Sequence, residues 1–257
     1  MKGILFGVSL VVLLALAPSV RAEQAQGMQA LAQAMRSHDY DRGRDSSMDR
    51  TPMQTMLARV NPSTIQELEA TSIALQSNPN NADLLFRRGF AAMQASDQNP
   101  VMSQGWLHFA AIDLEQSLRL NPNNWAVQHD YAQTAYEVGT PGYPMAITHF
   151  TAAIRLNPKS ARSYMGRGLT YIMMHDQTHA TPDLQQALII DPNLRTELEQ
   201  QVRDSYARLQ DIADAQQILR TMEQLWRVDP TARTPDQCSA HGGSMSTGRC
   251  LVLNPPH

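Results

Sequence analysis

Prolines that follow Asn or Asp divide the chain at regular distances. These Asn-Pro and Asp-Pro pairs end at Pro79, Pro122, Pro158, Pro192 and Pro230, with intervals of 43, 36, 34 and 38 residues. Proline cannot donate a backbone N–H to a helix, and it moves the preceding residue out of the α region. A period near 34 residues is typical of repeat proteins in which each unit buries its apolar face against its neighbours. The chain is therefore predicted to be an array of similar helical units.

The unit at residues 157–192 shows the pattern most clearly. Its first half carries Tyr164, Gly168 and Tyr171, and its second half carries Leu184, Ala187, Leu188 and Ile190. Spacings of three and four residues place such side chains on one face of a helix. The unit is therefore predicted to be two helices joined by a short turn.

These units resemble tetratricopeptide repeats, whose first helix follows W-x2-L-G-x2-Y and whose second helix carries A-x3-F, another Ala and Pro. The third unit matches at Tyr164, Arg167, Gly168, Tyr171, Ala180, Leu184, Ala187 and Pro192. The second matches at Ala132, Ala146, Phe150, Ala153 and Pro158, and the first at Leu85, Gly89, Ala110, Leu114 and Pro122. The resemblance covers residues 63–230 and implies an all-α, right-handed solenoid of helical hairpins. Gly168 would lie where the two helices of its hairpin approach most closely.

The chain also departs from the family pattern. No unit has Trp at the first position, and Arg167 replaces a core Leu. The first unit carries about nine extra residues around 96–104, and the unit at 194–230 is degenerate. These departures leave the helix boundaries of the first and fourth units open.

The first 22 residues have the layout of a cleavable signal peptide. Lys2 precedes an apolar run from Ile4 to Ala17, and small residues surround a predicted cleavage site after Ala22. The apolar run is shorter than the roughly 20 residues of a membrane-spanning helix. The alternative is an uncleaved N-terminal anchor. The mature protein is therefore expected in the periplasm or the secreted space, without an integral membrane segment.

Two segments flank the predicted repeat domain. Residues 23–62 are polar and are expected to be partly flexible, with short helices at 25–35 and 53–60. A better helix is predicted at 63–77, with Glu67 placed as a capping-box partner. Residues 231–257 are rich in Gly and Pro, lack helical periodicity and are expected to form an irregular tail.

The charge of the chain argues against nucleic acid as a partner. Without Lys2 and Arg21 the mature chain has 19 basic and 24 acidic residues and a formal net charge of −5. Its single remaining lysine is Lys159, and the basic residues do not cluster. Binding to nucleic acid or to an anionic membrane depends on such clusters, so both partners are disfavoured.

Cys238 and Cys250 are the two cysteines, and both lie in the tail. An even number of cysteines in an exported chain indicates a disulfide. The bond would close a loop of about 13 residues, worth on the order of 3 kcal/mol in the chain-entropy model. A zinc site would need two further ligands, and only His241 is nearby.

No motif in the sequence indicates catalysis. H-E-x-x-H, G-x-S-x-G and phosphate-binding glycine loops do not occur, so we predict a chain that is not an enzyme and needs no cofactor. One alternative is metal handling of a copper-like kind through the turn at 173–179, where His175 and His179 follow two methionines. The other interpretation of this turn is a polar connection with methionines that face the core.

The resemblance places one face of each first helix on a concave groove. The predicted groove residues are Phe86, Arg87, Phe90, His129, Asp130, Gln133, Tyr136, Arg162, Met165, Leu169, Ile172, Glu199 and Arg203. Aromatic side chains and Met beside a few charges are typical of peptide-binding surfaces. The alternative is that Phe86, Phe90 and Ile172 pack between repeats. The predicted function is a non-catalytic protein-interaction module, an exported adaptor or assembly factor with a protein or peptide partner in the periplasm or envelope.

Overall fold

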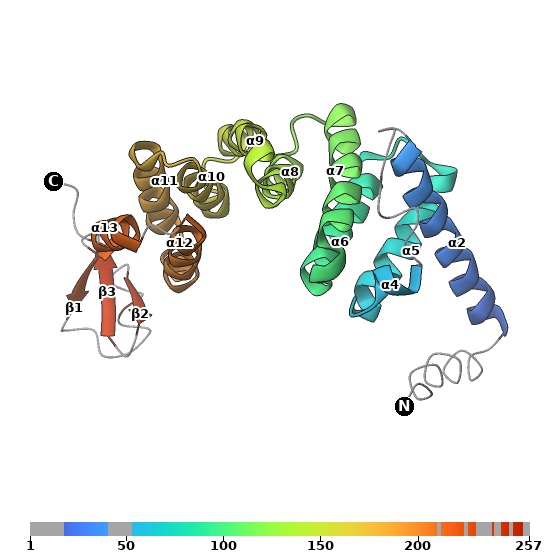
Figure 1. Ribbon diagram of the computed structural model, residues 1–257, viewed down its shortest axis with the longest axis horizontal. Coiled ribbons are helices and arrows are strands. Elements are labelled where there is room, and N and C mark those ends of the chain that lie inside the picture. The colour runs from blue at the N-terminus through green and yellow to red at the C-terminus, as the bar shows by residue number, and fades with distance from the viewer. Residues whose placement is uncertain are drawn as a thin grey trace. The chain divides into compact units, whose positions relative to one another are not determined.

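The computed structural model of the chain describes residues 18–40, 53–209, 212–223, 226–229, 238, 243–246 and 249–253 (Figure 1). These residues are helical except for turns and a small C-terminal sheet. The apolar run of the predicted signal peptide and the charged run at 41–52 lie outside the described residues. None of the described helices combines the length and the apolar character that a membrane crossing requires.

The chain forms two compact units, Met1–Pro122 and Asn123–His257. The first unit contains α2 (Pro18–Tyr40), α4 (Met53–Leu57), α5 (Pro62–Ser77), α6 (Ala82–Gln98), the short 3₁₀ helix η1 (Pro100–Met102) and α7 (Ser103–Leu120). Helices α6 and α7 form a hairpin, α5 packs against α6, and α2 packs against α5 and reaches α7. Its core includes Leu68, Leu85, Trp106, Phe109 and Leu114, all almost fully buried.

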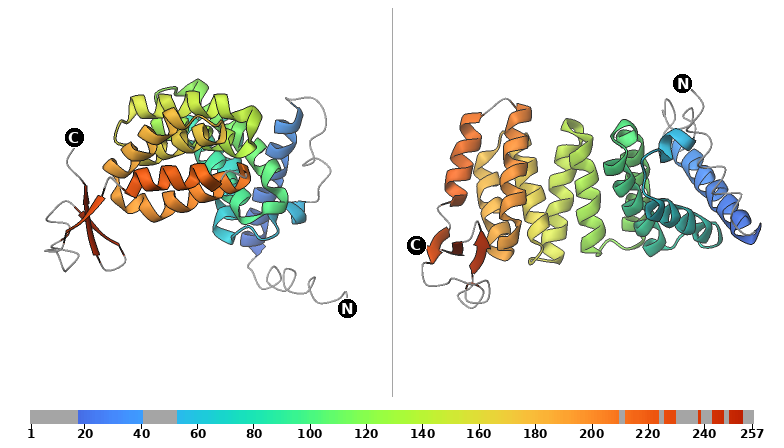
Figure 2. Two further views of the ribbon diagram at one scale, coloured as in Figure 1. Left: turned by 60° about the vertical axis from the view of Figure 1, so that its left-hand side comes forward. Right: turned by 90° about the horizontal axis from the view of Figure 1, so that it is seen from below.

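The second unit consists of three successive helical hairpins and the sheet. The helices are α8 (Trp125–Val138), α9 (Tyr143–Leu156), α10 (Ala161–Met173), α11 (Gln177–Ile190), α12 (Arg195–Leu209) and α13 (Ile212–Glu223). The 3₁₀ turns η2 (Thr140–Gly142) and η3 (Pro192–Leu194) precede α9 and α12. Figure 2 shows the pairs α8–α9, α10–α11 and α12–α13 following one another, and the packing contacts agree.

Glycine marks the closest approach of two helices, as predicted. A Cβ atom added to Gly168 on α10 would lie 2.6 Å from Leu184 Cδ2 and 3.2 Å from the Ala180 carbonyl oxygen on α11. A Cβ atom on Gly89 would lie 2.9 Å from Leu114 Cγ and 3.3 Å from the Ala110 carbonyl oxygen. The two hairpins therefore share one register, the register predicted from the repeat pattern.

The Asn-Pro turns end one helix and start the next. The backbone N–H groups of Asn78, Asn121 and Asn157 bond to the carbonyl oxygens of Ala74, Ser117 and Ala153 and close the preceding helices. Asn81 and Asn124 lie three residues after Asn78 and Asn121. The Asn81 side chain accepts the backbone N–H of Leu84 at 3.0 Å, and the Asn124 side chain accepts that of Ala126 at 3.1 Å. An asparagine at this position is a favourable N-cap, which explains the short turns.

The extra residues of the first repeat form hydrogen bonds to helix α4. They form the end of α6, η1 and the start of α7. Asn99 donates from Nδ2 to the carbonyl oxygens of Met56 at 2.9 Å and Thr55 at 3.2 Å, and Trp106 donates from Nε1 to Met56 at 3.3 Å. The insertion thus supplies polar partners to a short helix that precedes the repeats.

The tail differs from the prediction of an irregular segment. Strands β1 (Trp226–Asp229), β2 (Gly243–Ser246) and β3 (Arg249–Leu253) form an antiparallel sheet in the order β1-β3-β2. Cys238 and Cys250 form the expected disulfide, with 5.4 Å between their Cα atoms. Strand β1 begins before the predicted boundary at 230. Strands of four or five residues carry too little periodicity to be recognised without their partners.

Helix α2 is also longer than predicted. The expected helix at 25–35 runs from Pro18 to Tyr40, so the predicted cleavage site after Ala22 falls within its first turns. The buried residues Leu31 and Met35 supply its apolar contacts with the rest of the first unit.

Candidate functional site

Two phenylalanines lie one helical turn apart on α6: Phe90 is exposed and Phe86 is half-buried. The ring centroids of Phe86 and Phe90 are 6.4 Å apart, and Phe90 is 44% exposed. Between them in sequence, Arg87 forms a bidentate ion pair with Glu67 of α5, at 2.8 and 3.2 Å. Phe86, Arg87 and Phe90 are called the α6 surface patch below. The alternative, in which Phe90 is buried between repeats, does not hold.

The predicted groove residues of α8 contact each other and the neighbouring helices. His129 Nδ1 lies 3.1 Å from Ser163 Oγ on α10, and its ring centroid is 5.4 Å from that of Phe150. Gln133 donates to Glu137 at 2.8 Å, and the rings of Tyr136 and Tyr143 are 6.0 Å apart. These side chains are partly buried, so they are only partly available to a partner.

Burial shifts two neighbouring titratable groups on α8 in opposite directions. Burial, together with the positive charge of Arg162, lowers the pKa of His129 to about 4. Burial raises the pKa of Asp130 to about 7. Both groups therefore favour their uncharged forms in the folded protein.

The predicted arginines of the second unit are exposed and ion-paired. Arg162 on α10 binds both carboxylate oxygens of Glu197 on α12, at 2.9 and 3.2 Å. Arg203 lies 3.7 Å from Glu199, which also accepts from Arg195 at 2.8 Å. The first pair joins α10 to α12, whereas the pairs of Glu199 lie within α12. The exposure of Arg162 and Arg203 to solvent keeps their bonds weak.

Three predicted groove residues belong to the core instead. Met165 and Leu169 are 5% and 3% exposed, and Ile172 is fully buried. They pack in one cluster with Leu198 and Val202. Helix α12 lies against α10 and covers this face. The prediction that Met165, Leu169 and Ile172 line an open groove is therefore wrong.

No protein-family model and no curated protein matches the sequence. Among solved structures, the chain is similar to a crystal structure of MamA protein, with a TM-score of 0.50, 18% identity, and coverage of 66% of this chain and 90% of that one. It is also similar to MamA residues 41–end from Desulfovibrio magneticus RS-1, with a TM-score of 0.49, 20% identity, and coverage of 67% and 89%. At 18% identity, the similarity to the MamA crystal structure with a TM-score of 0.50 concerns the fold alone. The chain has a tetratricopeptide-like fold.

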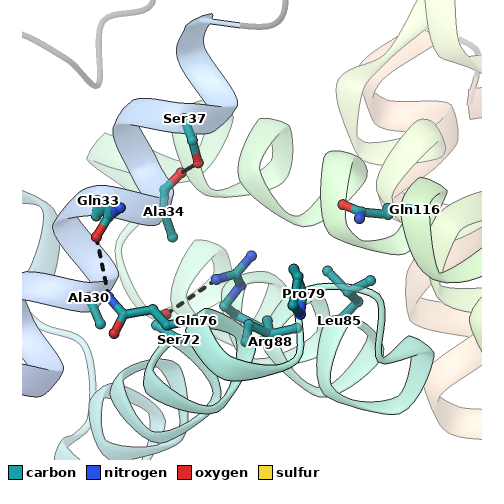
Figure 3. Close-up of a pocket in the computed structure, with 11 residues that line it drawn as sticks. Ala30, Gln33, Ala34, Ser37, Ser72, Gln76, Pro79, Leu85, Arg88 and Gln116 are labelled. Carbon is teal, nitrogen blue, oxygen red and sulfur yellow. Dashed lines mark hydrogen bonds between the residues drawn. The ribbon is translucent and has the colours of Figure 1, made fainter.

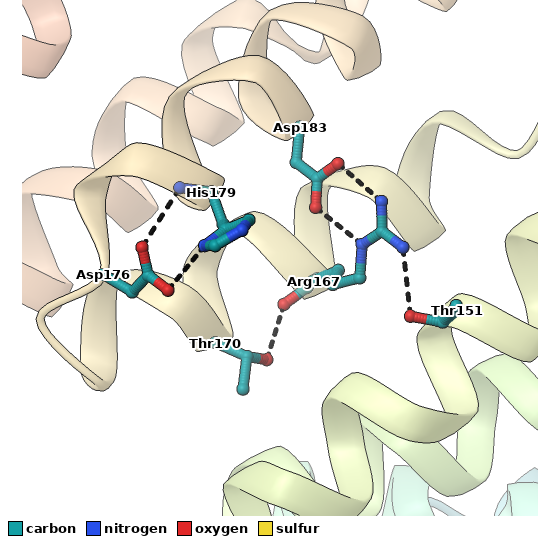
Figure 4. Close-up of polar contacts among 7 residues, drawn as sticks. Thr151, Arg167, Thr170, Asp176, His179 and Asp183 are labelled. Carbon is teal, nitrogen blue, oxygen red and sulfur yellow. Dashed lines mark hydrogen bonds and ion pairs between the residues drawn. The ribbon is translucent and has the colours of Figure 1, made fainter.

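Within this tetratricopeptide-like fold, the α6–α7 hairpin and the α10–α11 hairpin each contain an Arg–Asp ion pair that sequence reasoning missed. The first pair is buried and the second is partly buried. Arg88 on α6 binds Asp113 on α7 at 2.7 and 2.8 Å, and both side chains are buried. Arg167 on α10 binds Asp183 on α11 at 2.7 Å through both oxygens, and Thr151 accepts a further bond at 3.0 Å (Figure 4). The arginine that replaces a core Leu is therefore neutralised across its hairpin.

A recurring signal for this pair exists in the sequence. Each arginine precedes the glycine of the close approach, and each aspartate precedes the leucine that this glycine contacts. The second hairpin has Tyr131 and His149 in these places, with ring centroids 4.7 Å apart and an edge-on geometry of 75°. The same gap between two helices is thus filled by charges in two hairpins and by rings in one.

The His/Met turn caps a helix. Asp176 is the N-cap of α11: its side chain accepts the His179 backbone N–H at 3.1 Å and contacts His179 Nδ1 at 2.6 Å (Figure 4). The Tyr171 ring stacks on His179 with 5.1 Å between centroids. In the described part of the chain, no group of three or more His, Cys, Asp or Glu side chains comes together in a way that could hold a metal ion.

A cavity of the first unit lies between α2, α5, α6 and α7 (Figure 3). Its volume is about 330 Å³, and buried Arg88 lies at its floor. Sequence reasoning did not find it, because its lining residues come from four helices separated along the chain.

Proposed function

We propose that this chain is a non-catalytic protein-interaction module, an exported adaptor or assembly factor for an envelope or secreted complex. The observation that carries the proposal is the α6 surface patch. Aromatic rings on a rigid helix lose little conformational freedom when a partner covers them, and aromatic side chains are enriched among the residues that dominate binding energy.

The partner that suits this patch is a protein or peptide segment with apolar side chains. Phe86 and Phe90 would supply the apolar contact, while Arg87 keeps one edge of the patch polar through its pair with Glu67. The metal-handling alternative has no comparable support, because Asp176 and Tyr171 already contact His179.

Export rests on the N-terminal sequence. The basic residue, the apolar run and the small residues before Glu23 have the order of a signal peptide. Intact-mass measurement of the protein recovered from the periplasm or medium should give a chain that starts at Glu23. A mature protein that keeps Met1 would contradict export by cleavage at this site.

Site-specific photo-crosslinking tests the binding surface. A benzoyl-phenylalanine at position 90 should crosslink to a discrete partner in an envelope extract. The same group at position 101 should not, although Val101 is 75% exposed in the same unit and is therefore a matched control. The double variant Phe86→Ala with Phe90→Ala should lose this partner and keep its helical circular dichroism.

Truncating two aromatic anchors typically costs 2 kcal/mol or more, about a thirtyfold loss of affinity. Equal crosslinking from positions 90 and 101, or a folded double variant that still binds the partner, would place the interaction elsewhere. Loss of helical signal in the double variant would show that the two rings stabilise the fold.

A further inference from the structure

The cavity of the first unit has a polar lining that the proposed function does not use. The polar side chains around it are Gln33 and Ser37 on α2, Ser72 and Gln76 on α5, Arg88 on α6 and Gln116 on α7. In Figure 3, Ser37 and Gln116 lie on opposite sides of the cavity, and the Arg88 guanidinium points into it from below. Its volume, about 330 Å³, is at the lower end of the range for small-ligand sites.

This cavity is separate from the α6 surface patch. Leu85 and Arg88, three residues apart, line the cavity, whereas Phe86 and Phe90, four residues apart, form the patch. At 100° per residue, these two pairs point to nearly opposite sides of α6. A ligand in the cavity would therefore not occupy the surface assigned to the protein partner.

Arg88 presents a buried donor to the cavity. It is 5% exposed, it gives Nε and one Nη2 hydrogen to Asp113, and its Nη1 lies 3.5 Å from Ser72 Oγ. A guanidinium has five N–H groups, so two remain without an acceptor among the described residues. Each guanidinium nitrogen already has one acceptor, and a ligand oxygen in the cavity would accept one of the remaining N–H groups as a charge-assisted hydrogen bond.

The glutamine amides complement this donor. Gln76 donates from Nε2 to Gln33 Oε1 at 3.2 Å, which leaves the Gln76 oxygen and the Gln33 amide hydrogens free to face a ligand. Gln116 brings a further amide from α7. An amide-lined site offers both donors and acceptors, and it therefore suits a ligand group that has both.

We infer that the cavity binds an uncharged carboxamide, with its carbonyl oxygen on Arg88 and its N–H groups on the glutamine oxygens. Arg88 is the one charged residue among those that line the cavity, and Asp113 already neutralises it. A carboxylate would bring a second negative charge beside Asp113 in a partly buried place, and it is therefore disfavoured. The carboxamide can come from a free small molecule or from an Asn, Gln or main-chain amide of a peptide.

Titration with a matched pair of probes tests this inference. Propionamide should cause saturable shifts in the ¹H–¹⁵N spectrum of the mature protein. Propionate, which has a carboxylate in place of the single carboxamide, should bind at least tenfold more weakly at pH 7. A short peptide of Gln and Gly that binds more tightly than the single amide would identify a peptide as the source. Equal affinity of the two would identify a free amide.

Three variants locate the site without disturbing the buried ion pair. Ser37→Trp should block the cavity and abolish binding, and Gln116→Ala should weaken it about fivefold, the value of one net hydrogen bond. Gln104→Ala, on an exposed position of the same helix α7, should leave binding unchanged. No saturable binding of the amide, equal binding of the carboxylate probe, or unchanged binding in Ser37→Trp would each overturn the inference.

Discussion

His129 and Asp130 are neighbours in sequence, and the charged form of each destabilises the folded protein. His129 becomes charged as the pH falls, and Asp130 becomes charged as the pH rises. The pKa of His129 is lowered to about 4, chiefly by burial and also by Arg162, so protonation favours the unfolded chain as the pH falls from about 6.5 toward 4. Burial raises the pKa of Asp130 to about 7. The protonated Asp130 therefore contributes fully to folding stability below the ordinary pKa of an aspartate, and this contribution is lost as the pH rises through 7. The two effects partly cancel between pH 4 and 6.5.

Replacing His129 should separate these effects. Relative to the parent protein, His129→Gln should gain stability as the pH falls from 6.5 to 4, by on the order of 2–3 kcal/mol, because glutamine cannot take up the proton. The free energy of unfolding in urea, measured at half-unit pH steps, gives this difference. His175→Gln, at an exposed position, is the control. Parallel curves for His129→Gln and the parent would contradict the buried, neutral histidine.

Among single residues, sequence reasoning was most accurate where backbone sterics decide. Gly168 lies at the predicted close approach, because a Cβ atom there would overlap Leu184. It was wrong for Met165 and Leu169, since the same residue types occur on exposed grooves and in cores. The neighbour that covers a face decides between these possibilities, and for α10 that neighbour is α12.

At the scale of the elements, each hairpin fills the gap between its two helices in its own way. The first and third hairpins use Arg with Asp, and the second uses Tyr131 with His149. A buried ion pair can often be replaced by a well-packed pair, whereas removal of one partner leaves an uncompensated charge. The ring pair of the second hairpin is therefore a natural replacement for the charges of the third.

Exchange of the pair tests this equivalence. Asp183→Ala should destabilise the protein by about 3 kcal/mol, because Arg167 loses its acceptors in a mostly buried place. Arg167→Tyr with Asp183→His should recover most of that loss, since it copies the second hairpin. Asp113→Ala, at a pair with less exposure, should cost more than Asp183→Ala. Chemical denaturation supplies all three values, and a double variant no more stable than Asp183→Ala would refute the equivalence.

At the scale of the whole molecule, the chain consists of two units with their own cores. The boundary falls between Pro122 and Asn123, at one of the Asn-Pro turns. The first unit buries Trp106, Phe109 and Leu114, and the second buries the cluster around Leu184 and Leu198. A core within each unit is the condition for a fragment to fold alone.

Separate expression of the two units tests their independence. The fragments 18–122 and 123–257 should each give a helical spectrum and a cooperative thermal transition. As a control, a break after Gly139 separates α8 from α9, which pack as one hairpin, and should leave the shorter fragment of the second unit unfolded. A fragment 123–257 that is unfolded alone but folded in the full chain would show that the second unit depends on the first.

The sequence by itself determined the repeat period, the helical hairpins, the glycine at the close approach and the cysteine pair. These features depend on short-range sterics, on helical spacing and on the count of cysteines, which can be read from neighbouring residues. The structure agrees with each of them at Asn78, Gly89, Gly168 and the bond between Cys238 and Cys250.

Only the tertiary structure decided which surfaces are open and which groups meet. Asp113 reaches Arg88 across 25 residues, β3 pairs with β1 across a long connection, and residues from four helices line the cavity of the first unit. The local pattern around each of these residues is compatible with burial or with exposure. Burial, ion pairing and strand pairing are properties of two segments brought together, so they become definite only when the partner segment is in place.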